Sequence, residues 1–399
     1  MADILDLASR RGLSESDTKQ LAGAGLSDGC ALIRLTAVAT PPWRRLGERA
    51  IEPNAYYLPD WELAVNASAQ GRTGASVLCA SSPEPSARLI GLMPVIPLRR
   101  AFMIPLPALA SAHPYGTLCT PLIDRDMAED AVAQLLLKAR NTGARALLLR
   151  EVALDGAAMA AFTASARHAG IRPRVLRSHL RACLDATRDG EELLRDALGP
   201  KKMKELRRQR HRLAEHGAVR FTVARTPRDV AAAIEIFLKL EASGWKGQRG
   251  TALLQVEGDA TFIRRAAVAL AEADQCEIVT LRAGDTPVAA GIVLRHQDRA
   301  FFFKLGVDEG FARFSPGVQL ALDLTRYLCA DPAIASADST ASPDHPMINP
   351  IWRGRFAIGD VLIPLRPRDP VVALIQAALL VRQSVLDLAR RGVHFIRRR

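Results

Sequence analysis

One segment in the last third of the chain has the residue types of a phosphate-binding loop. An aromatic run over residues 301–307 leads into a loop with Arg313, Ser315, Pro316 and Gly317, and an apolar helix is expected directly after it. A helix start presents backbone N–H groups without intrahelical acceptors, together with the positive end of the helix dipole. Pyrophosphate fits such a position, so the segment predicts a site for a phosphate-bearing cofactor.

A second segment, residues 338–355, carries side chains suited to proton transfer. Asp338 ends an expected strand, and His345 is of the residue type that titrates near neutral pH. We expect these two residues to be the catalytic pair, although capping of the next helix is an equally simple role for them and for Asp344. No Cys–His or Ser–His pairing is legible, which favours direct attack on the substrate without a covalent enzyme intermediate.

Length and composition indicate a soluble protein of two or three domains. The 399 residues are 49% hydrophobic and 24% charged. We count no apolar run of the roughly 18–20 residues that span a bilayer, and the N-terminus lacks the apolar stretch of a signal peptide. These features predict a cytoplasmic protein, with a peripheral position at the inner membrane as an alternative.

The cysteines are too dispersed for a metal site. None forms a CxxC pair or has a histidine at ligand spacing, so we expect reduced, buried side chains and no metal. Their positions are Cys30, Cys79, Cys119, Cys183, Cys276 and Cys329.

The formal net charge of +12 favours an anionic partner. Much of this charge lies in residues 201–212 and in the arginine-rich tail over residues 390–399. Both clusters also fit a solvated helix face and a frayed end. DNA is the less favoured partner, because no helix-turn-helix, finger or heptad pattern accompanies the charge.

The chain contains an internal duplication. Two expected hairpins, over residues 75–98 and 277–295, share a central glycine, Gly91 in one and Gly291 in the other. Each hairpin is followed by an extended stretch, a loop with Gly and Pro, an apolar helix and a further strand. This order predicts an α+β fold with a mixed sheet and helices on both of its faces. Four parts are expected, namely a helical leader over 1–28, halves over 29–190 and 191–366, and an amphipathic basic helix over 367–399.

The second half resembles the CelD-like branch of the GNAT acyltransferases, which is associated with cellulose biosynthesis and related to FemABX-type tandem-GNAT enzymes. The residues that carry the resemblance are LGPKKMKELRRQRHRLAEHGAVRF (198–221), EASGWKG (241–247), GDTPVAAGIVL (284–294) and FKLGVDEGFARFSPGVQL (303–320). The resemblance implies two tandem GNAT-like domains, each a mixed, mostly antiparallel sheet flanked by helices, with the first one degenerate.

The resemblance also implies a donor site for acetyl-CoA or another acyl-CoA. Members of the family seat the pyrophosphate on a Q/R-x-x-G-x-G/A loop, which corresponds here to residues 313–318 with one glycine where two small residues are usual. The implied donor contacts are Leu305, Gly306, Val307, Arg313, Ser315, Pro316, Gly317 and Val318. The implied acceptor contacts are Trp245, Lys246, Lys304 and Asp344. An alternative role for Trp245 is to cover the edge of the core.

Three functions remain open at this point. The first is an acyl-CoA-dependent N-acyltransferase, with acetyl transfer to an amino sugar or another envelope-related amine as the expected reaction. The second is a FemABX-like aminoacyl-tRNA-dependent transferase, with residues 201–212 as the RNA contact. The third is a non-catalytic partner of an envelope polysaccharide synthase.

Two further segments have an expected supporting role. His113, Tyr115 and Gly116 occupy the first-half loop that corresponds to the cofactor loop, and HPYGTLCTPL lacks its basic residue. We therefore expect this loop to shape the acceptor groove. The apolar segment 371–381 either packs on the domain as a terminal helix or, together with the basic tail, docks on an anionic membrane or a synthase partner.

Overall fold

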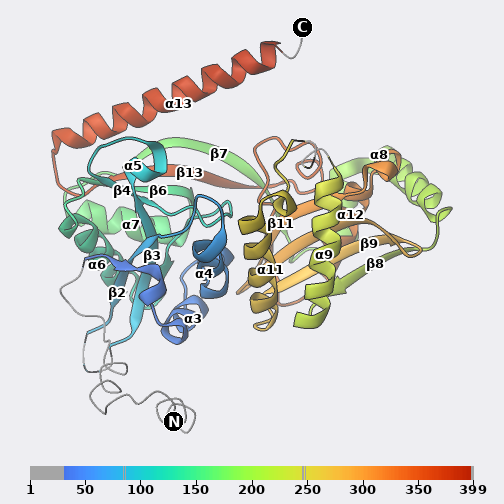
Figure 1. Ribbon diagram of the computed structural model, residues 1–399, viewed down its shortest axis with the longest axis horizontal. Coiled ribbons are helices and arrows are strands. Elements are labelled where there is room, and N and C mark those ends of the chain that lie inside the picture. The colour runs from blue at the N-terminus through green and yellow to red at the C-terminus, as the bar shows by residue number, and fades with distance from the viewer. Residues whose placement is uncertain (1–30, 84, 86, 245–246, 248, 397–399) are drawn as a thin grey trace.

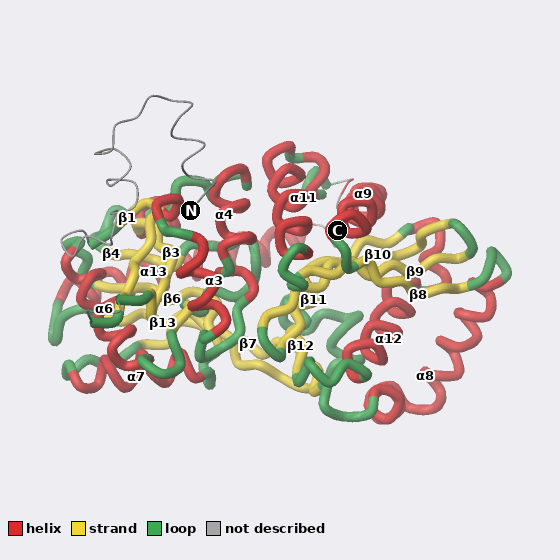
Figure 2. The backbone as a smooth tube through the Cα atoms, turned by 90° about the horizontal axis from the view of Figure 1, so that it is seen from below, coloured by secondary structure: helices red, strands yellow, loops and turns green. Residues whose placement is uncertain are grey.

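The structure is a computed structural model that describes residues 31–396, apart from residues 84, 86, 245–246 and 248. The leader expected over residues 1–28 lies outside the described residues, as do Trp245 and Lys246. Strands from both halves of the chain form one long sheet (Figure 1). Figure 2, turned by 90°, shows helices on either side of these strands.

The first half of the chain alternates short helices with strands. Its elements in order are β1 (Ile33–Arg34), η1 (Leu35–Ala37), α3 (Thr40–Glu48), η2 (Ala55–Tyr57), α4 (Pro59–Ser68), β2 (Ser76–Ser81), β3 (Leu89–Pro97), α5 (Leu98–Phe102), β4 (Ala108–Ser111), β5 (Leu122–Ile123), α6 (Ala128–Asn141), β6 (Ala146–Ala153), α7 (Ala157–His168) and β7 (Arg174–Asp185).

The second half has longer helices. Its elements are α8 (Gly190–Ala214), β8 (Val219–Ala224), α9 (Pro227–Ser243), η3 (Leu253–Gln255), α11 (Glu257–Ala271), β9 (Cys276–Ala283), β10 (Thr286–His296), β11 (Arg299–Val307), η4 (Glu309–Phe314), α12 (Pro316–Cys329), β12 (Ser336–Asp338), β13 (Gly354–Pro364) and α13 (Pro370–Ile396). Gly199, at φ 70°, and Pro200 kink α8, so the basic stretch is the second part of this helix.

The order of strands repeats about the centre of the sheet. From one edge the order is β1-β2-β3-β4-β6-β13, and from the other edge it is β8-β9-β10-β11-β12-β7. In each set the fourth and fifth strands are parallel, β4 with β6 and β11 with β12. The remaining neighbours along this order are antiparallel. The expected α+β fold of two similar halves, each a mixed and mostly antiparallel sheet flanked by helices, is confirmed.

The two halves exchange strands at the centre of the sheet. β13 comes late in the chain but pairs with β6 of the first half, with Ile358 opposite Ala153. β7 comes before α8 but pairs with β12 of the second half, with Cys183 opposite Asp338. β7 and β13 also pair with each other. The segments 29–190 and 191–366 are therefore halves in sequence, while each half of the sheet takes a strand from the other segment.

Alternating side chains of the central strands fill cores on both faces of the sheet. Phe301 and Phe303 of β11 pack with α4, α9 and α11, whereas Phe302 packs with α8 and α12 on the opposite face. This alternation follows from the two-residue repeat of a strand. The strand that leads to the expected cofactor loop is thus buried on both faces, which fixes its position.

The C-terminal helix α13 begins on the sheet and then projects away from the rest of the chain (Figure 1). Within it, Pro370–Ala389 has a mean hydropathy of 1.7 and is long and apolar enough to cross a membrane by length and composition. The expectation that no stretch reaches this length is therefore wrong. Gln376, Arg382 and Gln383 interrupt the run of apolar letters without making the stretch polar on average.

Candidate active site

The second half of the sheet opens between its two parallel strands. β11 and β12 pair only from Arg299 opposite Ser336 to Phe301 opposite Asp338. Beyond this point β11 continues along β10, while the chain leaves β12 as an irregular segment over residues 339–353. A bulge at Phe303 shifts the pairing of β11 with β10, and bulges increase the local bend and twist of a strand. The two parallel strands therefore diverge.

A cavity of about 420 Å³ lies where the strands diverge. Three parts of the chain form its walls, namely the end of β11, the segment after β12 and the first-half loop around residue 115. The lining residues are Tyr115, Thr117, Phe302, Phe303, Lys304, Leu305, Val307, Ser339, Thr340, Ala341, His345, Met347 and Ile348. The structure thus brings four of the expected site residues together in one cavity wall, namely Lys304, Leu305, Val307 and His345.

The start of α12 has the geometry of an anion-binding helix terminus. Ser315 adopts the left-handed conformation at φ 53° as N-cap, its side chain makes no capping bond, and Pro316 lies in the first turn. The Gln319 N–H donates to the Ser315 carbonyl. Within the described chain we see no backbone acceptor for the N–H groups of Gly317 and Val318, so these are the available first-turn donors.

Gly317 is buried against the cavity wall. A Cβ at this position would lie 3.0 Å from Leu305 Cδ2, 3.2 Å from Val307 Cγ1 and 3.4 Å from the Met347 sulfur. A side chain here would require these neighbouring side chains to shift by a few tenths of an ångström, so the glycine favours close packing of α12 on β11. The helix start and the end of β11 are therefore coupled by direct packing.

Gly306 and Arg313 are two further expected donor contacts. Gly306 lets α9 approach β11, because a Cβ there would lie 2.7 Å from the Glu241 nitrogen and 3.1 Å from the Phe237 oxygen. Arg313 is exposed at the end of η4, and its guanidinium carbon lies 4.6 Å from the centre of the Phe314 ring. Arg313 is thus the exposed cation on the loop that precedes α12.

His345 is the imidazole in the cavity wall. Its Nδ1 accepts from the Met347 N–H at 3.3 Å, so the neutral ring in this arrangement carries its proton on Nε2. Asp344, the neighbouring residue, adopts φ 55° and is exposed, and it turns the chain so that His345 faces the cavity. Asp344 itself does not line the cavity.

Asp338 lies just behind the cavity in a buried ion pair. Its Oδ2 accepts from Arg181 Nη1 at 3.1 Å, and its Oδ1 accepts from the Thr340 N–H at 2.7 Å. The side chains of Arg181 and Asp338 are 2% and 3% exposed. A carboxylate engaged in this way is held in a fixed orientation, which favours positioning of the cavity wall over proton exchange with a substrate.

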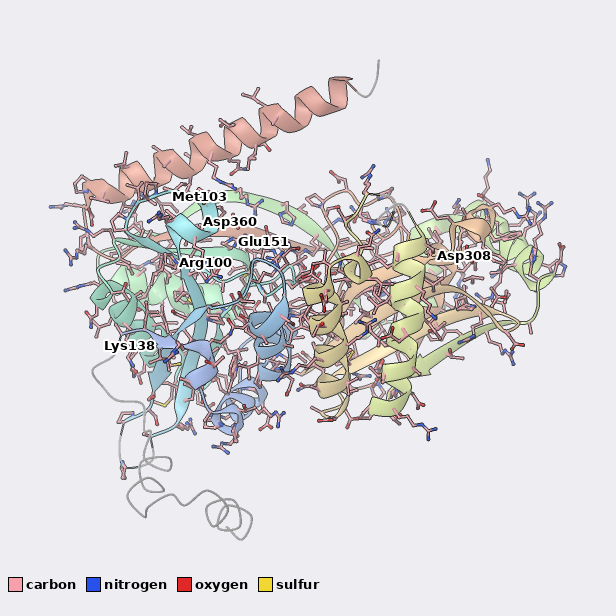
Figure 3. The ribbon with its side chains drawn as sticks, in the orientation of Figure 1. Arg100, Met103, Lys138, Glu151, Asp308 and Asp360 are labelled. Carbon is pink, nitrogen blue, oxygen red and sulfur yellow. The ribbon has the colours of Figure 1, made fainter. Side chains whose placement is uncertain are left out.

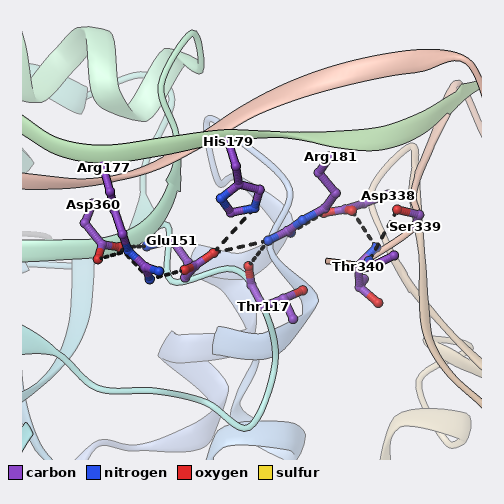
Figure 4. Close-up of polar contacts among 10 residues, drawn as sticks. Thr117, Glu151, Arg177, His179, Arg181, Asp338, Ser339, Thr340 and Asp360 are labelled. Atoms are coloured by element: carbon purple, nitrogen blue, oxygen red, sulfur yellow. Dashed lines mark hydrogen bonds and ion pairs between the residues drawn. The ribbon is translucent and has the colours of Figure 1, made fainter. Parts of the chain in front are cut away.

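Arg181 belongs to a chain of charges that crosses from one half of the sheet to the other (Figure 4). Its Nη2 donates to Glu151 Oε2 at 3.3 Å and to the Thr117 carbonyl at 2.8 Å. Glu151 also pairs with Arg177, whose Nε lies 2.6 Å from Asp360 Oδ2. His179 Nε2 lies 4.0 Å from Glu151 Oε2.

Sequence reasoning missed this charge chain. Its signal is the spacing of Arg177, His179 and Arg181, which places three polar side chains on one face of a strand. Burial lowers the pKa of His179, and the attraction of Glu151 opposes this shift only in part. The ring is therefore a neutral member of the chain near neutral pH.

Tyr115 and Lys304 form the polar part of the cavity wall. The Tyr115 hydroxyl donates to Asp259 Oδ2 at 2.6 Å, and burial raises the pKa of Tyr115. Lys304 Nζ lies 3.5 Å from Glu241 Oε1 and 5.9 Å from the centre of the Tyr115 ring. The first-half loop thus contributes directly to the cavity of the second half.

The described residues contain no cluster of His, Cys, Asp or Glu side chains that could hold a metal ion. The described cysteines Cys79, Cys119, Cys183, Cys276 and Cys329 are free thiols. Burial raises the pKa of the Cys119 thiol to about 12, so this thiol stays protonated.

Comparison with known families identifies the segment that supplies most of the cavity wall. Residues 200–344 match the family model described as an acetyltransferase (GNAT) domain. The match covers β8 to β12, including the opening between β11 and β12 and the start of α12. The chain therefore carries a GNAT domain and is a transferase. No curated protein sequence matches the chain.

Solved structures share the fold of both halves. The structure called FemX has 11% sequence identity and a TM-score of 0.53, covering 85% of this chain and 98% of its own. The C-terminal domain (DUF2156) of a protein described as a lysylphosphatidylglycerol synthetase from Agrobacterium fabrum has 14% identity and a TM-score of 0.51, covering 86% of this chain and 95% of its own. At these identities the similarity concerns the fold.

Proposed function

We propose that the chain is an acyl-CoA-dependent N-acyltransferase that uses the cavity between β11 and β12. One observation carries this proposal. Within the GNAT domain, the parallel pair opens onto a cavity of about 420 Å³ whose wall packs directly on a helix start with available N–H donors. A thioester arm in the opening and a pyrophosphate at Gly317 and Val318 match these two features.

The proposed reaction is direct acyl transfer. The acceptor amine loses a proton and attacks the thioester carbonyl, the C–N bond forms, the C–S bond breaks, and the departing thiolate takes up a proton. The cavity wall supplies His345, whose Nε2–H in the neutral ring can donate a hydrogen bond to the carbonyl oxygen as negative charge develops there. Asp338 positions this wall through its bonds to Arg181 and Thr340.

The acceptor lies on the Tyr115 side in this account. Tyr115, Thr117 and Lys304 line that side of the cavity and come from both halves of the chain. Trp245, Lys246 and Asp344 remain proposed acceptor contacts. The proposed acceptor class is an amino sugar or another envelope-related amine, and the proposed donor is acetyl-CoA. We also propose that the chain belongs to the CelD-like branch.

Release of free thiol from acetyl-CoA, measured over a panel of amines that includes amino sugars, tests the proposal. We expect amine-dependent thiol release that falls at least a hundredfold in Gly317→Glu, because the new side chain meets Leu305, Val307 and Met347 and adds a negative charge at the pyrophosphate position. Ala330→Glu adds the same side chain at the exposed far end of α12 and should retain activity. A folded Gly317→Glu protein with full activity would refute the cofactor site.

One observation favours a second candidate, an aminoacyl-tRNA-dependent transferase. The second part of α8 exposes a basic face that includes Lys201, Lys204, Arg207, Arg208 and Arg212. Such a face suits a polyanion. Salt-sensitive tRNA binding that is lost in Lys201→Glu/Arg207→Glu, together with no thiol release from any acyl-CoA, would replace the first function with the second.

A further inference from the structure

The C-terminal helix α13 has two apolar faces, and the residues that the structure describes cover only one of them. Val372, Ile375 and Leu379 are buried against β4, β6 and β13. Leu374, Val381, Val385 and Leu388 are 57–66% exposed on another side of the same helix. A soluble helix packed on its own domain needs one apolar stripe, so the second stripe requires a separate explanation.

A strongly basic cavity lies at the N-terminal end of the same helix. It has a volume of about 550 Å³, and its walls include Arg172, Arg174, Arg366 and Arg368. Asp369, the carboxylate in this wall, already pairs with Arg145 and accepts from the Val371 N–H.

These arginines outnumber the carboxylate in the cavity wall. Arg174 donates to the neutral Gln376 side chain at 2.5 Å. The carboxylate of Asp369, which pairs mainly with Arg145, also interacts electrostatically with Arg366. For Arg172 and Arg368 we see no carboxylate partner among the residues that the structure describes, and all three arginines are exposed. Four like charges around one cavity predict an anionic ligand, and phosphate is the group that arginine binds with two parallel hydrogen bonds.

We propose that α13 and this arginine cavity dock the protein on the surface of an anionic phospholipid bilayer. The lipid phosphates occupy the arginine cavity, and the stripe of Leu374, Val381, Val385 and Leu388 enters the boundary between headgroups and acyl chains. The sequence adds further positive charge beyond this stripe, since residues 390–399 include five arginines.

Charge complementarity selects a lipid surface over a second copy of the chain. A second copy that covered the stripe would bring another set of these arginines to the same region, in a chain whose net charge is already +12. The buried side of the helix also argues against crossing the bilayer. Val372, Ile375 and Leu379 would have to leave the core of the first half before the helix could span.

Co-sedimentation of the full chain with vesicles tests this proposal without any measurement of transferase activity. We expect binding to vesicles of 70% phosphatidylcholine and 30% phosphatidylglycerol, with at least tenfold weaker binding to pure phosphatidylcholine and a loss of binding in high salt. Carbonate extraction should release the protein, as expected for a surface contact. Retention in the membrane after extraction would overturn surface docking in favour of a spanning helix.

Two test variants, each with a control variant, distinguish binding through the proposed surface from a general effect of charge or hydrophobicity. Arg366→Glu/Arg368→Glu and Leu374→Gln/Val381→Gln/Leu388→Gln should each weaken binding at least tenfold. The matched controls are Arg207→Glu/Arg208→Glu on α8 and Leu137→Gln/Leu254→Gln elsewhere on the surface, and the apolar control should bind as the wild type does.

Three results would overturn the proposal. The first is equal binding to both vesicle types, and the second is an equal loss of binding in the two charge-reversal variants. The third is a dimer, measured by light scattering, that the α13 substitutions convert to a monomer while vesicle binding is unchanged. The last result would assign the stripe to a second copy of the chain.

Discussion

The two parallel strand pairs of the sheet have the same topology but different surroundings. In the second half, β11 and β12 diverge onto an open cavity. In the first half, β4 and β6 pair over Ala108–Ala110 and Ala146–Leu148, and the chain's own loop then fills the space. Ser111 Oγ accepts from the Arg150 N–H at 2.9 Å, and the Cys119 N–H donates to the Glu151 carbonyl at 3.1 Å.

The next helices along the chain, α6 in the first half and α12 in the second, differ in the charge of their first turns. The first turn of α6 contains Glu129 and Asp130, which themselves interact with the positive end of the helix dipole. The first turn of α12 contains no acidic residue and leaves the N–H groups of Gly317 and Val318 available. An anionic ligand is therefore repelled at one helix start and attracted at the other.

One copy of the duplicated unit therefore supports the other. The first-half loop that fills its own opening also extends Tyr115 and Thr117 into the wall of the second-half cavity. Figure 3 shows Glu151 and Asp360 close together in the first half of the sheet, on the side toward the second half. The charge chain through these residues and Arg181 connects the filled opening to the open one.

The largest effect is expected from removing the cation between the halves. Arg181→Met leaves Asp338 without its buried partner and Glu151 without one of its own, so we expect a loss of about 3–5 kcal/mol in the free energy of unfolding. Urea unfolding at pH 7 measures this loss. The double variant Arg181→Met/Asp338→Asn should recover part of it, and a wild-type stability for the single variant would show that the halves do not depend on this contact.

Acid sensitivity is the next largest effect. His296 at the end of β10 accepts from the Asn54 N–H at 2.8 Å, and its Nε2 lies 2.9 Å from the Gly47 carbonyl oxygen, so it joins the halves as a neutral ring. Burial lowers its pKa to about 4. Because the unfolded chain binds this proton near pH 6.5, the contribution is present above that pH and is lost as the pH falls toward 4.

This loss amounts to about 3 kcal/mol for a shift from 6.5 to about 4. Urea unfolding of the wild type and of His296→Gln between pH 7.5 and 4.5 measures the difference in slope. His113, with a pKa that burial lowers to about 3, adds a slope of the same sign in both proteins and cancels in the comparison. Parallel slopes for the two proteins would contradict the neutral, buried state of His296.

A smaller effect is expected where the first-half loop meets the second half. Tyr115→Phe removes the hydrogen bond to the Asp259 carboxylate, and we expect a loss of about 1–2 kcal/mol in unfolding free energy. If the loop walls the cavity, the KM for the acceptor should also rise. A change in stability with no change in any kinetic constant would show that the loop does not take part in the acceptor site.

The smallest effect is expected in the first half, where the loop fills the space beyond β4 and β6. Glu129→Gln/Asp130→Asn removes the acidic residues from the start of α6 but leaves the loop in place. We expect no new CoA site, as measured by the stoichiometry of binding. A second site in this variant would show that charge alone, and not the filled opening, keeps the donor out of the first half.

Much of the fold follows from local sequence patterns, whereas the centre of the molecule does not. The hairpins around Gly91 and Gly291 and the helix after Pro316 are short-range features that turn chemistry and periodicity specify. The exchange of β7 and β13 depends on pairing between residues such as Cys183 and Gly354, which local patterns do not determine. The alternation of Arg177, His179 and Arg181 signals a polar strand face but not its partners.

The candidate site likewise combines features that the local sequence specifies with features that depend on how distant segments pack. Residues that are close in sequence, such as Ser315, Pro316 and Gly317, could be assigned to a helix start in advance. The role of Asp338 could not, because it depends on Arg181 across the exchanged strand. The contact of Tyr115 with the second-half cavity likewise depends on how the two halves pack.

Calorimetric titration of the full chain with acetyl-CoA tests the central claim most directly. We predict one site per chain, lost in Gly317→Glu and retained in Ala330→Glu, because only the opening between β11 and β12 is available to the donor. No heat with acetyl-CoA or CoA, two sites per chain, or unchanged binding by Gly317→Glu would contradict it.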